Sequence, residues 1–398
     1  MLSLAVLPFY LAINIYIIRR FFCWLESCHR IFRLKRLKIS LGIVYTLLAF
    51  ALAIAFFMPP ASEPRRIVQL ISNYWLGVFL YTVLTVSPGH LLSVLLRRVF
   101  RVLDIDFFKR RRNHIISGIL TLSVIAGVST YGIYHAQDIK LNEYSVDIAK
   151  EVNGTKSLKV VLIADLHLGF SIGEKHIRKT VDMINAQNPD IVCIAGDIYD
   201  NDFNAVKNPD KIAETLSEIK STYGTYACWG NHDVDEKILA GFTFGVRGAK
   251  SHNANMAEFF RKANITLLED ETRLIDNKFY VSGRIDEKKP ATPNNERKTP
   301  YELLSGLDKT KPVIVIYHEP DELKELSDAG CDLLLCGHTH NGQLFPGNLT
   351  IKLFWENAAG YLKKGNMHNI VTSGVGVWGP FMRVGTDAEV VSVNISFK

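Results

Sequence analysis

Apolar residues follow two different patterns along this 398-residue chain. In the first part, residues 1–136, they form four long stretches without Asp, Glu, Lys or Arg, at 2–18, 39–58, 67–87 and 115–134. A helix needs about 20 apolar residues to cross a bilayer, so this part is predicted to hold four transmembrane helices. The first stretch also fits a cleaved signal peptide. It lacks a preceding basic segment and a small-residue cleavage site, so we favour an uncleaved span.

The second part, residues 137–398, contains short apolar runs instead, rich in β-branched residues. The runs lie at 158–164, 191–195, 225–229, 313–317 and 333–336. Runs of this length are typical of strands buried on both faces, and helix-like segments such as 177–187 and 212–220 separate several of them. The pattern predicts an α/β domain large enough for one buried core, joined to the first part by a tether at 136–158.

Basic residues are unevenly divided among the segments that join the apolar stretches. Residues 19–38 and 88–113 each carry seven Lys or Arg, whereas residues 59–66 carry two. Cytoplasmic loops are enriched in Lys and Arg, so the two basic segments are predicted to face the cytoplasm. With four spans, both termini and the α/β domain then lie on the extracytoplasmic face of the cell membrane.

The net charge of +6 combines two parts of opposite sign. Residues 1–137 carry 16 Lys or Arg against 4 Asp or Glu, a net charge of +12, and residues 138–398 carry 30 against 36, a net charge of −6. The positive charge therefore belongs to the membrane loops. We expect anionic lipid as a partner at those loops and no nucleic acid.

Polar motifs follow each of the five apolar runs. They are Asp165-Leu166-His167, Gly196-Asp197-Ile198-Tyr199-Asp200, Gly230-Asn231-His232-Asp233, the single His318, and Gly337-His338-Thr339-His340. Each motif alone is more often a capping pair or a core histidine than a metal site. Together they place acids, histidines and an amide at the carboxyl edge of a sheet, where open α/β folds usually bind ligands.

The chemistry of these side chains favours a particular class of metal. Carboxylate, imidazole and amide ligands without cysteine suit Mn, Fe or Zn, while the number of histidines disfavours Mg²⁺ and Ca²⁺. Two such ions can share a hydroxide and polarise the oxygens of a phosphate ester. The motifs therefore predict hydrolysis of a phosphate ester at a site with two divalent transition-metal ions.

From about residue 159 onward, the chain resembles the calcineurin-like metallophosphoesterase superfamily. The run Gly337-His338-Thr339-His340-Asn341-Gly342-Gln343 is similar to the membrane-associated or secreted bacterial phosphodiesterase subgroup, which usually has Gly at the position of Asn341. Gly374-Val375-Gly376 and Pro380-Phe381-Met382-Arg383 also resemble this subgroup, whereas Thr386-Asp387-Ala388 departs from its proline-rich ending. The resemblance implies an αββα sandwich with a two-metal centre.

The resemblance also assigns roles to residues by matching position. One metal would take Asp165, His167 and His340, the other would take Asn231, His318 and His338, and Asp197 would bridge them. His232 matches the catalytic histidine beside the leaving group, and Asp200 matches the carboxylate that orients it. These assignments imply attack on the phosphate by a metal-bridged hydroxide.

The sequence thus predicts a membrane-anchored, metal-dependent phosphoric ester hydrolase acting on phosphodiesters of lipid or the cell envelope. No motif distinguishes diesters from monoesters. The alternative is a catalytically silent membrane sensor for a phosphorylated ligand, which intact His232 and Asp200 disfavour. A transporter is the weakest alternative, because the apolar stretches lack ionisable side chains. Two segments, 235–256 and 286–311, are either substrate-facing loops or surface insertions, and a bridge between Cys193 and Cys228 remains open.

Overall fold

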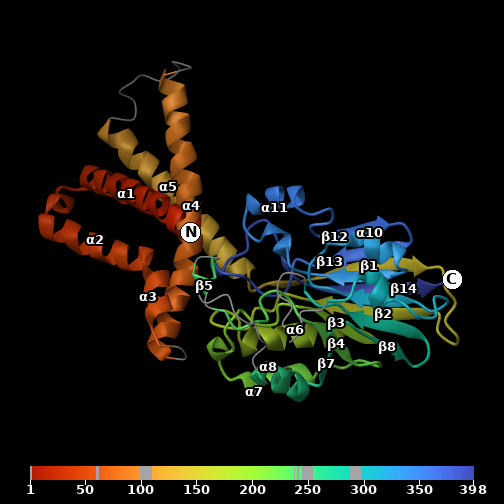
Figure 1. The fold of residues 1–398 in the computed structure, drawn as a ribbon. Coiled ribbons are helices and arrows are strands. Elements are labelled where there is room, and N and C mark those ends of the chain that lie inside the picture. Colours follow the sequence, from red (N-terminus) through yellow and green to blue (C-terminus); the bar gives the residue numbers. More distant parts are fainter. Residues whose placement is uncertain are drawn as a thin grey trace. The chain divides into compact units, whose positions relative to one another are not determined.

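The structure is a computed structural model that describes residues 2–59, 62–98, 110–236, 238–239, 242–243, 254–286 and 297–398 (Figure 1). The two expected substrate-facing loops lie in part outside these residues. Contacts divide the chain into two compact units. The helical unit consists of Met1–Ile133 with Leu239–Phe242 and Gly379–Phe381, and the α/β unit consists of Tyr134–Ile238, Thr243–Trp378 and Met382–Lys398.

Long apolar helices make up the helical unit. They are α1 (Leu2–Cys28), α2 (Lys35–Ala49), α3 (Ala51–Phe57), α4 (Glu63–Arg98) and α5 (Arg111–His135), with the 3₁₀ turn η1 (Arg30–Arg33) after α1. Among the described residues, α4 over Glu63–Leu96 and α5 are long and apolar enough to cross a membrane. The pair α2 and α3, bent by 58°, is a third candidate if it counts as one span. The structure therefore supports two or three of the four predicted spans, and the span at 2–18 stays a prediction.

The α/β unit begins almost directly after the last candidate span. Helix α5 ends at His135, and strand β1 (Ile139–Ile148) starts after three intervening residues. The segment expected as a tether thus contains a ten-residue strand. It pairs in parallel with β14 (Ala388–Phe397) along its whole length. The sequence gives little sign of this pairing, because the two strands lie about 250 residues apart.

Two six-stranded sheets form the centre of the α/β unit. The first has the order β1-β14-β2-β3-β4-β7, with β2 (Ser157–Ile163), β3 (Ile191–Ala195), β4 (Thr225–Cys228) and β7 (Ile265–Leu267). The second has the order β12-β13-β11-β10-β9-β8, with β8 (Glu271–Ile275), β9 (Phe279–Gly283), β10 (Val313–Ile316), β11 (Leu333–Cys336), β12 (Gly360–Lys364) and β13 (Met367–Val371). A short ladder joins β5 (Ile238–Leu239) to β6 (Phe242–Thr243). All five apolar runs predicted as strands are confirmed.

The main core lies between the two sheets. It combines alternate residues of β2, such as Val160 and Leu162, with Ile314 of β10 and Leu335 of β11, all fully buried. All six cysteines are free, so Cys193 and Cys228 are buried thiols and not a bridge.

Helices cover the outer faces of the sheets (Figure 1). On the first sheet, α6 (Glu174–Ala186) contacts β1 and β14, α7 (Pro209–Ser217) packs between α6 and α8 (Ala254–Lys262), and α8 contacts β7. On the second sheet, α9 (Pro300–Leu303) and α10 (Leu323–Asp328) bury leucines against β10 and β11. The resulting helix, sheet, sheet, helix layering is the one that the family resemblance implies. The shorter turns are η3 (Phe203–Ala205), η4 (His340–Gly342), α11 (Gly347–Thr350) and η5 (Ile351–Leu353).

Candidate metal centre

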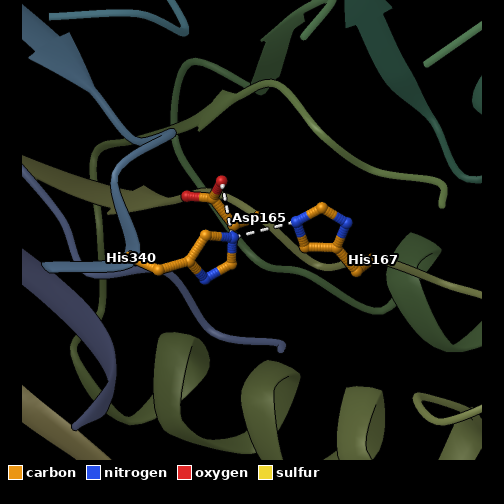
Figure 2. Close-up of side chains that lie close together, drawn as sticks. All are labelled: Asp165, His167 and His340. Carbon is orange, nitrogen blue, oxygen red and sulfur yellow. Dashed lines mark hydrogen bonds and ion pairs between the residues drawn. The ribbon is translucent and has the colours of Figure 1, made fainter. Parts of the chain in front are cut away.

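Three buried side chains form the first cluster at the carboxyl ends of β2 and β11. Asp165 and His167 follow β2, and His340 lies in η4 after β11. Nε2 of His340 is 3.0 Å from Nε2 of His167 and 3.4 Å from Oδ1 of Asp165. Figure 2 shows the Asp165 carboxylate and the His167 ring both directed at this one nitrogen of His340. The structure thus brings together the three residues predicted for the first metal.

The second cluster combines Asn231 after β4, His318 after β10 and His338 after β11. Oδ1 of Asn231 lies 3.1 Å from Nε2 of His318 and 2.9 Å from Nδ1 of His338. The same two histidine nitrogens are 3.2 Å apart. All the ligands predicted for the second metal therefore converge as well.

Asp197 lies between the two clusters. Its Oδ2 is 3.0 Å from Nε2 of His318 in the second cluster and 3.7 Å from Nε2 of His167 in the first. Its Oδ1 accepts a hydrogen bond of 2.7 Å from the backbone N–H of His232. This is the position that a bridging carboxylate requires.

The backbone of the candidate ligands is strained in a consistent way. Asp165, His167, Asp197, His338 and His340 all have positive φ angles, between 45° and 73°. Residues other than glycine seldom adopt this backbone conformation, and such strain clusters at functional sites. Glycine is required nearby, because a Cβ on Gly230 would lie 2.3 Å from Oδ1 of Asp197. The strand ends are thus shaped to point these side chains at one another.

Electrostatic interactions in the clusters are strong because the groups are buried. Burial raises the pKa of Asp165 to about 6. Burial also acts to raise the pKa of Asp197, but the neighbouring histidines, above all His318, outweigh it and hold that pKa well below its usual range. Burial, together with His167 and Arg383, lowers the pKa of His340 well below its usual value. A neutral His340 and an ionised Asp197 are the protonation states in which these groups bind cations.

The donor set fits transition-metal ions. In the contact between His167 and His340, only one of the two Nε2 atoms can donate a hydrogen bond to the other, and both lie near a carboxylate. A cation bound among these atoms would satisfy their converging lone pairs. Imidazole nitrogens with carboxylate and amide oxygens suit Mn, Fe or Zn.

His232 lies beside the first cluster and forms a further group of possible metal ligands with His167 and Asp200. Its ring is 5.1 Å from the ring of His167 and 6.0 Å from that of Trp378. Its Nδ1 is hydrogen-bonded to Oδ1 of Asn201, while Oδ1 of Asp200 lies 3.6 Å away. Asp200, the residue predicted to orient His232, therefore lies nearby, but the hydrogen bond to His232 is made by Asn201.

Three functional neighbours have no role in the sequence prediction. Besides Asn201, these are Asp233 and Arg383. The Asp233 carboxylate accepts hydrogen bonds from the backbone N–H of Gly230 at 2.7 Å and of Tyr199 at 2.9 Å, joining two ligand loops. The position of Asp233 inside a ligand motif is the sequence signal that could have indicated its role.

Arg383 is fully buried and organises the loop beneath His340. Its guanidinium donates to the backbone oxygens of Ser373 and Gly376, both at 2.7 Å, and lies 3.4 Å from Nδ1 of His340. It also donates to the backbone oxygen of Asp387 at 2.7 Å. The segment that departs from the subgroup's usual ending thus contributes a backbone oxygen here, and the Thr386 hydroxyl donates to the backbone oxygen of Gln343 at 2.8 Å.

The comparisons with known proteins agree with this geometry. Residues 158–342 match the calcineurin-like phosphoesterase family over the strands and loops that carry all seven candidate ligands. This region is a calcineurin-like metallophosphoesterase domain. Asn341, where the subgroup usually has Gly, has a φ of 49°, a conformation that Asn tolerates better than most residues.

Named relatives extend the similarity beyond that region. A transmembrane protein with metallophosphoesterase domain from Danio rerio is 29% identical over 293 residues, covering 69% of this chain and 62% of the relative. An uncharacterized metallophosphoesterase of Campylobacter jejuni is 31% identical over 263 residues, covering 64% of this chain and 63% of the relative. The phosphodiesterase YaeI of Escherichia coli is 27% identical over 236 residues, covering 56% of this chain and 76% of the relative. This chain therefore spans a little over three fifths of the length of the first two relatives.

Proposed function

We propose that this protein is a membrane-anchored phosphoesterase with a binuclear metal centre, and that it hydrolyses phosphodiesters of lipid or the cell envelope. The observation that carries the proposal is the convergence of seven candidate ligands into two clusters with Asp197 between them. The name of the YaeI relative supports a diester substrate.

Each residue has a definite task in this proposal. Asp165, His167 and His340 would hold one ion, Asn231, His318 and His338 the other, and Asp197 both. When bound, two such ions supply a water that is deprotonated near neutral pH and positive charge facing the phosphorus. Asp233 and Arg383 fix the loops that carry the ligands.

His232 would deliver a proton to the leaving oxygen. An amide oxygen only accepts hydrogen bonds, so the bond to Asn201 fixes the hydrogen on Nδ1 and leaves Nε2 for proton transfer. The carboxylate of Asp200 lies 3.6 Å from the same Nδ1 atom. An unperturbed histidine pKa near 6.5 suits this task at neutral pH.

Anchoring in the membrane is supported by the apolar helices α4 and α5 and by relatives named as transmembrane proteins. We propose four spans, with the phosphoesterase domain on the extracytoplasmic face, because of the distribution of basic residues among the loops. Anionic lipid would contact the two basic loops.

A substrate screen tests the proposed function. The full chain in detergent, loaded with Mn²⁺ or Zn²⁺, is assayed on phospholipids, nucleotide diesters and glycerophosphate polymers of the cell wall. Turnover of a lipid or envelope diester that chelation abolishes is the expected result. Binding of phosphorylated ligands without turnover of any of them would favour the sensor instead.

A further inference from the structure

An exposed apolar segment directly follows the last metal-ligand motif. Phe345, Leu349, Leu353 and Phe354 lie in and around α11 and η5, and we call these four side chains the apolar ledge. Leu353 and Phe354 are 81% and 78% exposed, more than any other large apolar side chain described in the α/β unit. Single exposed apolar residues are common on soluble proteins, but four within ten residues are a patch that indicates an interaction surface.

The ledge is fastened to the metal-binding loop at both ends. At its start, Gly342 and Gly347 approach so closely that a Cβ on Gly342 would lie 2.3 Å from the carbonyl carbon of Gly347. At its end, the ring of Trp355 packs edge-on against the ring of His338 with 5.2 Å between centroids. Neither sheet is covered by α11 (Figure 1). The ledge therefore presents apolar side chains beside the metal centre instead of contributing to the core.

The ledge segment carries a positive charge within an acidic domain. Lys352 is the one charged residue in 345–354, the nearby Glu356 is paired with Lys364, and residues 138–398 carry a net charge of −6. Lys352 is exposed between Ile351 and Leu353. Exposed apolar side chains with a lysine among them are typical of segments that lie in the interface of an anionic bilayer.

The chain connects the α/β unit to a candidate span by a short segment. Only residues 136–138 separate the end of α5, a candidate span, from the start of β1. Three residues reach at most about 10 Å, so β1 starts close to the end of α5 along the chain.

From these observations, we propose that the apolar ledge inserts into the lipid surface and that the metal centre draws its substrate from that surface. The second part, supply of substrate from the lipid surface, rests on the proposed function. It gives the substrate class as an amphiphilic phosphoester taken from the bilayer. The first part, insertion, depends only on the ledge.

Spin labelling of the full chain tests insertion without any need for turnover. The exposed or half-buried thiols are removed with Cys23→Ser and Cys28→Ser, and a nitroxide is attached in Leu353→Cys. The matched control carries the nitroxide in Lys324→Cys on α10, where the lysine side chain is 71% exposed. Both Zn-loaded chains are reconstituted in vesicles of equal parts phosphatidylcholine and phosphatidylglycerol, and collisions with oxygen and with a water-soluble nickel chelate are compared.

The expected result is that oxygen relaxes the label at 353 more than the nickel chelate does, with the order reversed at 324. Leu349→Cys, at a position 60% exposed, provides a second test site with the same expected result. Water-like accessibility at both 353 and 349 would overturn the proposal. Strong spin–spin broadening would overturn it too, because it would show that a second copy of the chain covers the ledge. An inactive protein whose labels are still in lipid would contradict the proposed function alone.

Discussion

The side chain of His232 is held by Asn201, with Asp200 as a more distant neighbour. Nδ1 of His232 is hydrogen-bonded to Oδ1 of Asn201, and Oδ1 of Asp200 is 3.6 Å from the same nitrogen. Asn201 has a φ of 59°, so two substitutions can separate its backbone role from its side-chain role. Glycine keeps the backbone conformation and removes the acceptor, whereas aspartate keeps an acceptor oxygen.

We expect Asn201→Gly to lower turnover about five- to tenfold, the effect of losing one hydrogen bond that orients a catalytic group. Asn201→Asp should retain most of the activity. The measurement is kcat on an alkyl diester and on a nitrophenyl diester. The loss should be larger for the alkyl diester, whose leaving group needs a proton. Equal losses on both substrates would mean that Asn201 does not act through His232.

His232 and His318 should respond differently to substitution, because His318 is one of the seven candidate ligands and contacts Asn231, whereas His232 is assigned to proton transfer. His232→Ala should keep both ions and lose about 10²–10⁴-fold in turnover, the usual range for a positioned general acid. His318→Ala should lose an ion and affect good and poor leaving groups alike. Metal analysis alongside kinetics distinguishes the two variants. Equal loss of metal in both would refute the role given to His232.

Replacing Asp197 should affect both ions at once, because its carboxylate lies between the clusters. Asp197→Asn and Asp197→Ala should both lower metal content and abolish hydrolysis, since each removes the negative charge that holds two cations together. Asp210, an exposed carboxylate paired with Lys262, offers a control in Asp210→Asn. Full metal occupancy with undiminished activity in Asp197→Ala would rule out the proposed centre.

Orientation in the membrane can be tested with protease. If the basic loops at 19–38 and 88–113 face the cytoplasm, protease added to intact cells should digest the phosphoesterase domain. Protection of the domain until the membrane is permeabilised would show the opposite orientation.

In the metal-free protein, Asp233 should make a contribution to stability that is lost as pH rises. Burial, and next the charge of Asp197, raise the pKa of Asp233 from 3.8 to about 7. Because the folded state holds this proton more tightly, the Asp233 carboxyl group contributes stability that is fully present below the unfolded pKa of 3.8. This contribution is lost as pH rises through the folded pKa of about 7. Between these values the slope of unfolding temperature against pH, measured in chelator, should therefore be more positive in Asp233→Asn than in the unsubstituted protein. An unchanged slope would contradict the assignment.

The extent of agreement between sequence and structure has physical reasons. Short apolar runs identify buried strands such as β2 and β10, and parallel strands bring their carboxyl ends to one edge, so Asp165 and His318 could be placed near a metal site from sequence. The sequence could not show whether Asp200 or Asn201 is hydrogen-bonded to His232. The answer depends on the left-handed backbone at Asn201, which directs the Asn201 side chain toward His232.

Long-range pairing is the other feature that local patterns do not reveal. Residues 139–148 alternate too weakly to separate a strand from a tether, and their partner lies in β14. In the sequence, Arg383 likewise stands out only as part of the motif Pro380-Phe381-Met382-Arg383. Its role depends on backbone carbonyls from Ser373 to Asp387 that come together in the folded loop.

The position of β14 between β1 and β2 determines when this domain can be completed. Both neighbours are made early during synthesis, yet each lacks its partner until residues 388–397 emerge. The first sheet therefore cannot form strand by strand in the order of synthesis. Until β14 is made, the edges of β1 and β2 that will face it are unpaired and could pair with other chains. Since Asp165 and His167 lie at the end of β2, we expect these two side chains to take their places only after β14 has paired with β2.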